Sequence, residues 1–570
     1  MTRKINYLSG TLAVLMCSFA WPALAQQNVP EPAAQEFLRQ QERERALREQ
    51  LETSPDVRLE RPTTEIEERL PTDETPCFDI RQITLEGDSA SQFQWALRAA
   101  NPANDPAIGR CLGAEGINIT MKRVQNAIVA RGYVTTRILA VPQDLQTGHL
   151  VLTVIPGRIR SIRFTEESSP RATVWNALPA NPGDILNLRD IEQALENLKR
   201  VPTAEADIQV APATDPEAQP GESDLVISWQ QGFPFRLNLS ADDSGSRSTG
   251  KYQSNVTVSY DHVLTLNDLF YASFNQDLGG GYSGNRGSDG HTIHYEIPYG
   301  YWLLGVTTGS HDYHQTVAGA SQSYVYSGKS KTAEIQLTRL IYRDAARKSN
   351  VYLQGWKRDN SSYIDDTEIL VQRREMAGWE TGITHREFIG NATLDASLAY
   401  RRGTGALGAI PAPEEEFGTG TSRPKIIKAN AQISIPFQIG EQSLRYQGSW
   451  RAQWNRTPLV SQDHFSIGGR FTMRGFDGEM TLAAERGWLI RNDLGIILAG
   501  QELYLGVDYG SVGGSSSRRL VGTELAGGVV GVRGGYRNFS YDLFIGEPIK
   551  QPDHFQTEAT VTGFSLNMQF

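Results

Sequence analysis

Four short stretches of this chain hold residue types that could do chemistry. Two of them, DGHTIHYE (289–296) and GSHDYHQ (309–315), each place two histidines three residues apart, as a metal site could. No cluster of acidic or cysteine residues accompanies either pair, and protein metal sites usually use three or four such ligands. We therefore expect these histidines at loop edges and predict no metal site.

A third stretch, GGVVGVRGG (527–535), is as rich in glycine as a phosphate-binding loop. Its spacing fits neither G-x-G-x-x-G nor G-x-x-x-x-G-K, the patterns whose backbone N–H groups cradle phosphates. We interpret it as a β-strand of a barrel, with small residues facing the lumen. No pairing of a nucleophile with a base stands out in the sequence either, so we expect no enzyme, no catalytic residue and no cofactor.

The fourth stretch, GGRFTMRGFDGE (468–479), sets Arg474, Gly475 and Phe476 among glycines. An arginine beside a glycine in a loop is usually a solvated side chain, and alone the tripeptide predicts nothing more. Its interpretation depends on the elements that surround it.

The first 25 residues have the three parts of a secretory signal peptide. These are the basic pair RK (3–4), the apolar segment LSGTLAVLMCSFA (8–20) and the cleavage site ALA (23–25). Cys17 lies inside the apolar segment, so we expect it to be discarded with the peptide. The mature chain would begin at Gln26, outside the cytoplasm.

Two cysteines, Cys77 and Cys111, would remain in the exported chain. Because that compartment favours oxidation, we expect a disulfide between them, with two free buried thiols as the alternative. The bridge would stabilise a small domain.

Charge and hydropathy limit the partners of the mature chain. The signal peptide takes two of the 55 basic residues and none of the 65 acidic ones, which leaves 53 against 65, a net charge of −12. Such a balance argues against a nucleic-acid partner. No later stretch has the roughly eighteen apolar residues of a membrane helix. If the chain crosses a membrane, it must do so with the strands of a closed barrel.

The N-terminal part of the mature chain predicts a tethered helix. EPAAQEFLRQQERERALREQLE (31–52) contains strong helix formers, but its apolar residues are too sparse to form a core stripe. Such a helix suits water or a water-filled hole, and we assign residues 26–52 to it. Residues 53–75, with three prolines among charged residues, have the composition of a linker.

Two small α+β units follow, at residues 76–156 and 157–232. In each, strand and helix patterns alternate, and the second contains LNLRDIEQALENLKRVP (186–202), whose leucines and isoleucine form one apolar stripe. We expect that helix to lie on a sheet. The two units form an internal repeat of architecture.

Residues 233–570 predict a transmembrane barrel. Segments of alternating apolar residues, such as ELYLGVDYG (502–510) and GFSLNMQF (563–570), recur between long Gly/Ser/Asp loops without an intervening helix pattern. At about ten residues per strand plus connections, the length suits roughly sixteen antiparallel strands. The chain ends on an aromatic residue, Phe570, as outer-membrane barrels often do.

With these elements in place, the chain resembles the TpsB transporters of two-partner secretion, the family of haemolysin activators and the filamentous-haemagglutinin exporter. RGYVTTRILAVPQDLQTGHLVL (131–152) is similar to the end of the family's first POTRA domain, and residues 186–202 are similar to the helix of its second. FTMRGF (471–476) resembles its loop motif, with Met473 where valine or leucine is more frequent. The fold implied is two periplasmic α+β POTRA domains followed by an all-β barrel.

The resemblance also implies that a loop near residues 463–484 folds back into the barrel, where its arginine pairs with an acid on the inner wall. Along residues 502–510 the apolar side chains share one face, so Asp508 points to the lumen and is the expected partner of Arg474. Gly475 would allow a close backbone approach, and Phe476 would pack the loop tip.

The function implied is secretion of an unfolded partner exoprotein, of the haemolysin or adhesin class, through an outer-membrane barrel without nucleotide hydrolysis. The helix of residues 26–52 would plug the resting pore, and Phe570 would be the signal read by the barrel-assembly machinery; outer-membrane lipids would surround the barrel. An insertase of outer-membrane proteins is the main alternative, although only two POTRA-like units are present. A general porin or an enzyme displayed on a barrel fits less well, because the first needs no periplasmic domains and the second needs a catalytic site.

Overall fold

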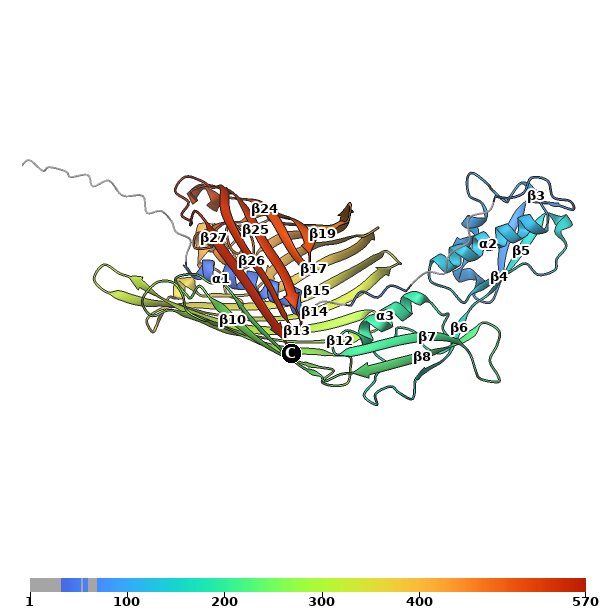
Figure 1. Ribbon diagram of the computed structural model, residues 1–570, viewed down its shortest axis with the longest axis horizontal. Coiled ribbons are helices and arrows are strands. Elements are labelled where there is room, and N and C mark those ends of the chain that lie inside the picture. Colours follow the sequence, from blue (N-terminus) through green and yellow to red (C-terminus); the bar gives the residue numbers. More distant parts are fainter. Residues whose placement is uncertain (1–31, 53–54, 60–68) are drawn as a thin grey trace, which may run out of the picture.

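The computed structural model describes residues 32–52, 55–59 and 69–570. The predicted signal peptide, residues 26–31 of the plug segment and part of the predicted linker lie outside the described residues. Two small α+β units extend from one end of a large β-barrel (Figure 1). The fold class expected from the sequence, POTRA domains followed by an antiparallel barrel, is confirmed.

The barrel is a closed antiparallel sheet of sixteen long strands within the described residues. The first strand, β9, pairs with the last, β27, and the two-residue strand β16 (Thr367–Glu368) only extends the edge of β15. The long strands are β9 (Phe235–Asp242), β10 (Gln253–Asp261), β11 (Leu269–Asp277), β12 (Gly287–Tyr299), β13 (Trp302–Ala318), β14 (Ser323–Arg343), β15 (Arg347–Ile364), β17 (Arg374–Ile389), β18 (Ala392–Thr404), β19 (Lys425–Ile439), β20 (Gln442–Asn455), β23 (Arg486–Leu498), β24 (Gln501–Gly513), β25 (Glu524–Tyr536), β26 (Phe539–Lys550) and β27 (Val561–Gln569).

The side chains of each strand alternate between the lipid face and the lumen, as the sequence predicts. In β24, Leu503, Leu505 and Val507 are 45%, 57% and 46% exposed, whereas Tyr504 and Asp508 are buried. The glycine-rich stretch of residues 527–535 forms part of β25, as expected, rather than a phosphate loop. Successive residues of a pleated strand point to opposite faces, so one segment can meet lipid outside and polar groups inside.

The first POTRA unit consists of a three-stranded sheet and one α-helix, with short 3₁₀ helices between them. Its sheet has the order β2-β5-β4, with β2 parallel to β5, and a separate pair is formed by β1 and β3. Cys77 and Cys111 are joined by a disulfide next to that pair. The elements are β1 (Phe78–Ile80), β2 (Gln82–Gly87), the 3₁₀ helices η1 (Ala90–Gln92) and η2 (Gln94–Ala100), β3 (Arg110–Leu112), α2 (Ala114–Ala130), β4 (Arg137–Leu139), η3 (Leu145–Thr147) and β5 (His149–Ile155).

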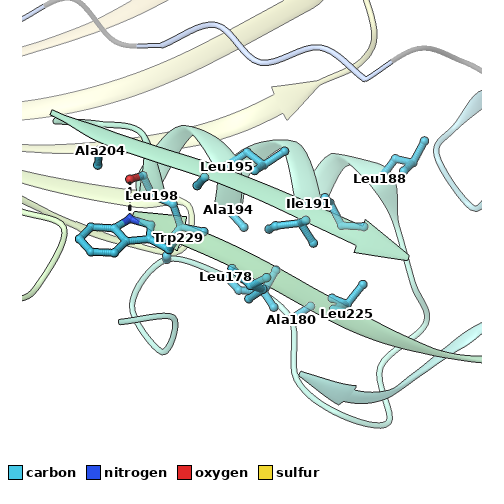
Figure 2. Close-up of a cluster of buried hydrophobic side chains, with 14 of the residues drawn as sticks. Leu178, Ala180, Leu188, Ile191, Ala194, Leu195, Leu198, Ala204, Leu225 and Trp229 are labelled. Atoms are coloured by element: carbon cyan, nitrogen blue, oxygen red, sulfur yellow. Dashed lines mark hydrogen bonds between the residues drawn. The ribbon is translucent and has the colours of Figure 1, made fainter. Parts of the chain in front are cut away.

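The second POTRA unit lies next to the barrel (Figure 1). Helix α3 packs its predicted apolar stripe on a sheet of order β6-β8-β7, and Trp229 Nε1 donates to the carbonyl of Leu198 at 3.1 Å (Figure 2). Asn187 caps the helix by accepting the N–H of Arg189 at 2.9 Å, which satisfies one of the free N–H groups at a helix start. The elements are β6 (Arg158–Phe164), α3 (Leu188–Leu198), β7 (Ala204–Pro212) and β8 (Glu222–Gln231).

Helix α1 (Pro32–Leu51) lies inside the barrel. It is held by side chains from well-separated parts of the wall: Gln253 of β10 accepts from Arg43, Glu334 of β14 accepts from Arg48, and Arg451 of β20 donates to Glu42. A hydrated lumen explains why this helix carries so few apolar residues. Over residues 32–52, 55–59 and 69–570, no helix is long and apolar enough to cross a membrane.

The expectation that the paired histidines lie at loop edges is wrong. His291 and His294 lie within β12, and His311 and His314 lie within β13. A spacing of three residues puts the members of each pair on opposite faces of a strand, so they cannot share a metal ion. His294 and His311 are buried toward the lumen, where each lies 3.6 Å from a carboxylate of α1 or its end, Glu52 and Glu36 respectively.

Candidate functional site inside the barrel

The loop between β20 and β23 folds into the lumen. It contains a short antiparallel pair, β21 (Phe465–Ile467) with β22 (Leu482–Ala484), and its apolar side chains form a buried cluster with the barrel wall. Within that cluster, Met473 and Phe476 are almost fully buried, and the rings of Phe476 and Phe555 pack nearly perpendicular, with their centroids 5.7 Å apart. The position of Met473 therefore suits an apolar side chain. The loop is packed into the barrel and does not extend into solvent.

Arg474 is bound to the wall by Asp508 of β24. Its backbone N–H and its Nε both donate to Asp508 Oδ2 at 2.9 Å, and Nη2 donates to Oδ1 at 2.7 Å. Both side chains are buried, with Arg474 3% and Asp508 1% exposed. The structure thus brings together the two residues that the sequence analysis paired. A bidentate contact of this kind orients the guanidinium as well as neutralising it.

A second carboxylate, Asp493 of β23, was missed by sequence reasoning. Arg474 Nη2 donates to Asp493 Oδ1 at 2.5 Å, and Arg533 of β25 donates to the other oxygen at 3.1 Å. Arg491 approaches Asp508 at 3.6 Å, so the cluster holds three arginines and two aspartates. The alternation of β23 could have revealed Asp493, because Leu494 beside it is exposed to lipid and Asp493 itself is buried. The two carboxylates offset part of the charge of the three arginines inside the lumen.

Three glycines let the loop backbone touch the wall. Gly475 has φ +89°, and a Cβ there would lie 2.6 Å from the carbonyl oxygen of Glu547. On the wall, a Cβ at Gly527 would lie 1.9 Å from the carbonyl oxygen of Arg474, and one at Gly546 would lie 3.0 Å from the Cα of Gly475. Only residues without a side chain allow this approach, so one glycine of β25 and one of β26 serve the loop contact.

The loop also contacts helix α1. Arg39 of α1 donates to the carbonyl of Gly478 at 3.0 Å, and Arg470 of the loop reaches Asp243 just after β9 at 3.2 Å. Beside α1, a cavity of about 490 Å³ separates the helix from β13, β14, β15 and their neighbours, with charged side chains such as Glu44 and Lys428 in its lining. The lumen therefore contains a polar cavity as well as helix α1 and the inward loop.

Phe570 closes the barrel seam. Its backbone N–H donates to the carbonyl of Leu237 in β9 at 2.8 Å, and its carbonyl accepts the N–H of Leu237 at 3.2 Å. Its side chain is 57% exposed and lies on the same outer face as Met568. The last residue thus joins the first strand of the barrel.

The second POTRA unit is hydrogen-bonded to the periplasmic turns of the barrel. Asn176 Nδ2 donates to the carbonyls of Leu266 and Pro298, at 2.6 and 3.1 Å. His262 Nδ1 accepts the backbone N–H of Asn267 at 3.0 Å, so its Nε2 carries the proton and donates to the carbonyl of Arg171 at 2.8 Å. Burial lowers the pKa of His262, which keeps this imidazole neutral in the junction.

An acidic pair of α3 faces the barrel mouth at the same junction. Arg343, at the end of β14, donates to Glu192 and Glu196 at 2.9 Å each, and Lys348 donates to Glu196 at 2.5 Å. Burial alone would raise the pKa of Glu196, but the charges of Lys348 and Arg343 lower it below the usual value. Glu196 is therefore ionised, and Arg343 orients both carboxylates.

Comparison with known proteins gives the same architecture. The chain is 39% identical over 550 residues to the outer membrane transporter CdiB-2 of Burkholderia pseudomallei strain 1026b, across 93% of each chain. It is 22% identical over 426 residues to the hemolysin transporter protein HpmB of Proteus mirabilis, across 74% of this chain and 73% of that one. The solved structure of CdiB from Acinetobacter baumannii, at 29% identity, superposes with a TM-score of 0.84 over 95% of this chain and all of that one.

Matches to families cover most of the described residues. Residues 78–157 match the ShlB-type POTRA domain, and residues 158–212 match a second POTRA domain. Residues 221–534, more than half of the chain, match the haemolysin secretion/activation protein family ShlB/FhaC/HecB. The chain therefore belongs to this family, as an outer-membrane transporter of two-partner secretion with its POTRA domains in the periplasm.

Proposed function

We propose that this chain exports one dedicated exoprotein in an unfolded form. The POTRA domains, residues 76–156 and 157–232, bind the exoprotein in the periplasm by pairing with its extended segments. The barrel, residues 233–570, then passes it to the cell surface. The observation that carries the proposal is that α1 is held in the lumen by hydrogen bonds and ion pairs, which water and a passing chain can replace.

No nucleotide drives this passage. Folding of the exoprotein outside the cell removes the unfolded form and so gives the transport its direction. We infer a client of the haemolysin or adhesin class, and the presence of two hemolysin transporter proteins among the relatives supports the first of these.

Within the barrel, Arg474, Gly475 and Phe476 hold the inward loop in its working position, with Asp508 as the wall partner. Phe570 acts earlier, as the signal that the barrel-assembly machinery reads when the barrel is inserted among outer-membrane lipids. The close backbone approach at Gly475 and the three hydrogen bonds to Asp508 support the loop's role.

The test is a secretion assay with the large exported reading frame expected beside this gene. The product is followed in the medium with the intact chain, without it, with Arg474→Ala, and with Arg519→Ala, an exposed arginine of an extracellular turn. Release should require the chain, fall with Arg474→Ala and stay normal with Arg519→Ala, with all three barrels folded in the membrane. Release that is the same with and without the chain would refute the proposal.

A further inference from the structure

A hollow of about 610 Å³ lies on the outer wall of the barrel, where β17, β18 and the start of β19 meet the residues that follow β20. Trp379 of β17, Arg402 of β18 and Lys425 of β19 form one row in its lining, because the sheet register pairs Trp379 with Arg402 and Arg402 with Lys425. Arg423 lies beside this outer row, since a Cβ at Gly405 would lie 2.9 Å from its Nη2. Three cations and one indole therefore line the hollow.

The outer row faces the membrane and not the lumen. The next residue of each strand, Glu380, Arg401 and Ile426, lines the cavity beside α1 inside the barrel. Successive residues of a strand point to opposite faces, so the outer row points away from the lumen. Arg343 and Lys348 hold the turn between β14 and β15 against α3 at the periplasmic end. Because the strands are antiparallel, the loop between β18 and β19 lies at the extracellular end.

Side chains on the outer face of β17 and β18 change from apolar to aromatic to basic toward the outside. Ile383 and Leu398 stand opposite each other and are exposed. Two residues beyond Leu398, Tyr400 packs against Trp379 with ring centroids 5.7 Å apart, and two residues further stands Arg402. Aromatic residues mark the interfaces of membrane barrels, and two residues advance a strand by about 6.6 Å. The outer row therefore lies at the depth of the lipid headgroups.

The cations of the hollow lack a carboxylate partner. Across residues 32–52, 55–59 and 69–570, the side chains of Arg402, Arg423 and Lys425 form no hydrogen bond or ion pair, and no acidic residue lines the hollow. Like charges directly opposite each other on a sheet repel, which is the position of Arg402 and Lys425. An anion from outside the chain would remove this repulsion.

A phosphate group on an amphiphile fits these side chains. Arginine offers planar pairs of N–H donors that match phosphate oxygens, and lysine offers a compact ammonium. Thr457 Oγ1 accepts the backbone N–H of Lys425 at 3.0 Å, so its hydroxyl proton is free to donate into the hollow. Trp379 provides an apolar wall on which a sugar ring or an acyl chain can pack. The donors thus match a phosphorylated lipid better than a free ion.

We propose that this hollow binds a phosphate group of lipopolysaccharide, the phosphorylated glycolipid of the outer leaflet, through Arg402, Arg423 and Lys425. The acyl chains of the lipid lie along the apolar face below, which includes Ile383 and Leu398. The bound phosphate neutralises the three cations and joins the extracellular ends of β18 and β19. The site lies outside the barrel, so it does not depend on the proposed passage of an exoprotein through the lumen.

The experiment measures binding of diphosphorylated lipid A to the purified full-length chain in detergent micelles by native mass spectrometry. R402Q/K425Q removes two cations of the hollow, and R518Q/R519Q is the charge-matched control, because it removes two exposed arginines of an extracellular turn away from the hollow. The unaltered chain and the control should bind the lipid with the same Kd. R402Q/K425Q should bind it at least about tenfold more weakly, since each charged hydrogen bond contributes about 1.5–3 kcal/mol.

A second comparison does not depend on the folding of any variant. Lipid A from which both phosphate groups have been removed keeps its acyl chains and its sugars. It should bind the unaltered chain at least about tenfold more weakly than the phosphorylated lipid does. Equal binding of the two lipids, or equal binding of the phosphorylated lipid to the two double variants, would overturn the inference.

Inorganic phosphate separates a lipid site from a site for the free ion. Millimolar inorganic phosphate should leave the lipid bound to the unaltered chain, because it lacks the acyl chains and the sugars. Complete displacement of the lipid would overturn its assignment as the occupant. These measurements and the secretion assay are independent, so a chain that binds no lipid A can still export its partner.

Discussion

At the residue scale, Arg474 is shared by two aspartates that bind it unequally. Asp508 accepts the backbone N–H and two side-chain N–H groups, whereas Asp493 accepts one. Asp508→Asn should therefore reduce secretion more than Asp493→Asn. Breaking a buried ion pair costs about 3–5 kcal/mol, enough to release the loop. The measurement is the amount of exoprotein in the medium at equal levels of folded barrel, and equal losses for the two variants would contradict the unequal binding.

The double substitution Arg474→Asp with Asp508→Arg, made without any other change, is a poor test of their contact. It would leave a new carboxylate at position 474 facing Asp493, which lies 2.5 Å from the present guanidinium. Adding Asp493→Asn removes that repulsion, so the exchange should restore more secretion in this background than without it.

The glycines of the wall allow a second prediction. Gly527→Ala would place a Cβ 1.9 Å from the carbonyl oxygen of Arg474, so the loop has to move away from the wall. Secretion should fall at least severalfold while the barrel remains folded. Gly528→Ala is the matched control, because its Cβ points outward and meets only the flexible end of Ile549, at 3.1 Å. Normal secretion by Gly527→Ala would show that the close approach is dispensable.

At the element scale, α1 should determine how far the resting pore is closed. Removal of residues 26–52 takes away a cylinder about 10 Å wide from a lumen that already contains a polar cavity of about 490 Å³. We expect ion conductance in planar bilayers to rise severalfold, with secretion retained. Arg451→Gln, which removes one anchor of α1, should give a smaller rise. A conductance that does not change on deletion would exclude α1 as the plug.

At the scale of the whole molecule, the two POTRA domains and the helix α1 inside the barrel favour an exporter over an insertase or a porin. Loss of the chain should abolish release of one exoprotein and leave the abundance of other outer-membrane barrels unchanged. Quantitative proteomics of outer membranes with and without the gene makes the comparison. A general fall in barrel proteins would favour the insertase, and a change limited to solute uptake would favour a porin.

Much of this architecture was predictable because barrels and amphipathic helices follow local patterns. Alternation along residues 502–510 correctly placed Asp508 in the lumen, and the stripe of α3 correctly predicted a helix on a sheet. The same alternation of side chains between the two faces of a strand, applied to β23, would have placed Asp493 in the lumen. Applied to the histidine pairs, it would have placed the two members of each pair on opposite faces of a strand.

The sequence by itself determined the order of domains, the strand faces and the motif of Arg474, since each depends on neighbouring residues and on the geometry of helix and strand. Only the tertiary structure decided that Arg474 bridges two strands, that three glycines meet where the loop touches the wall, and that three cations line one hollow on the outer wall. These contacts join segments far apart in the chain. They depend on barrel register and on the paths of loops, which no local pattern encodes.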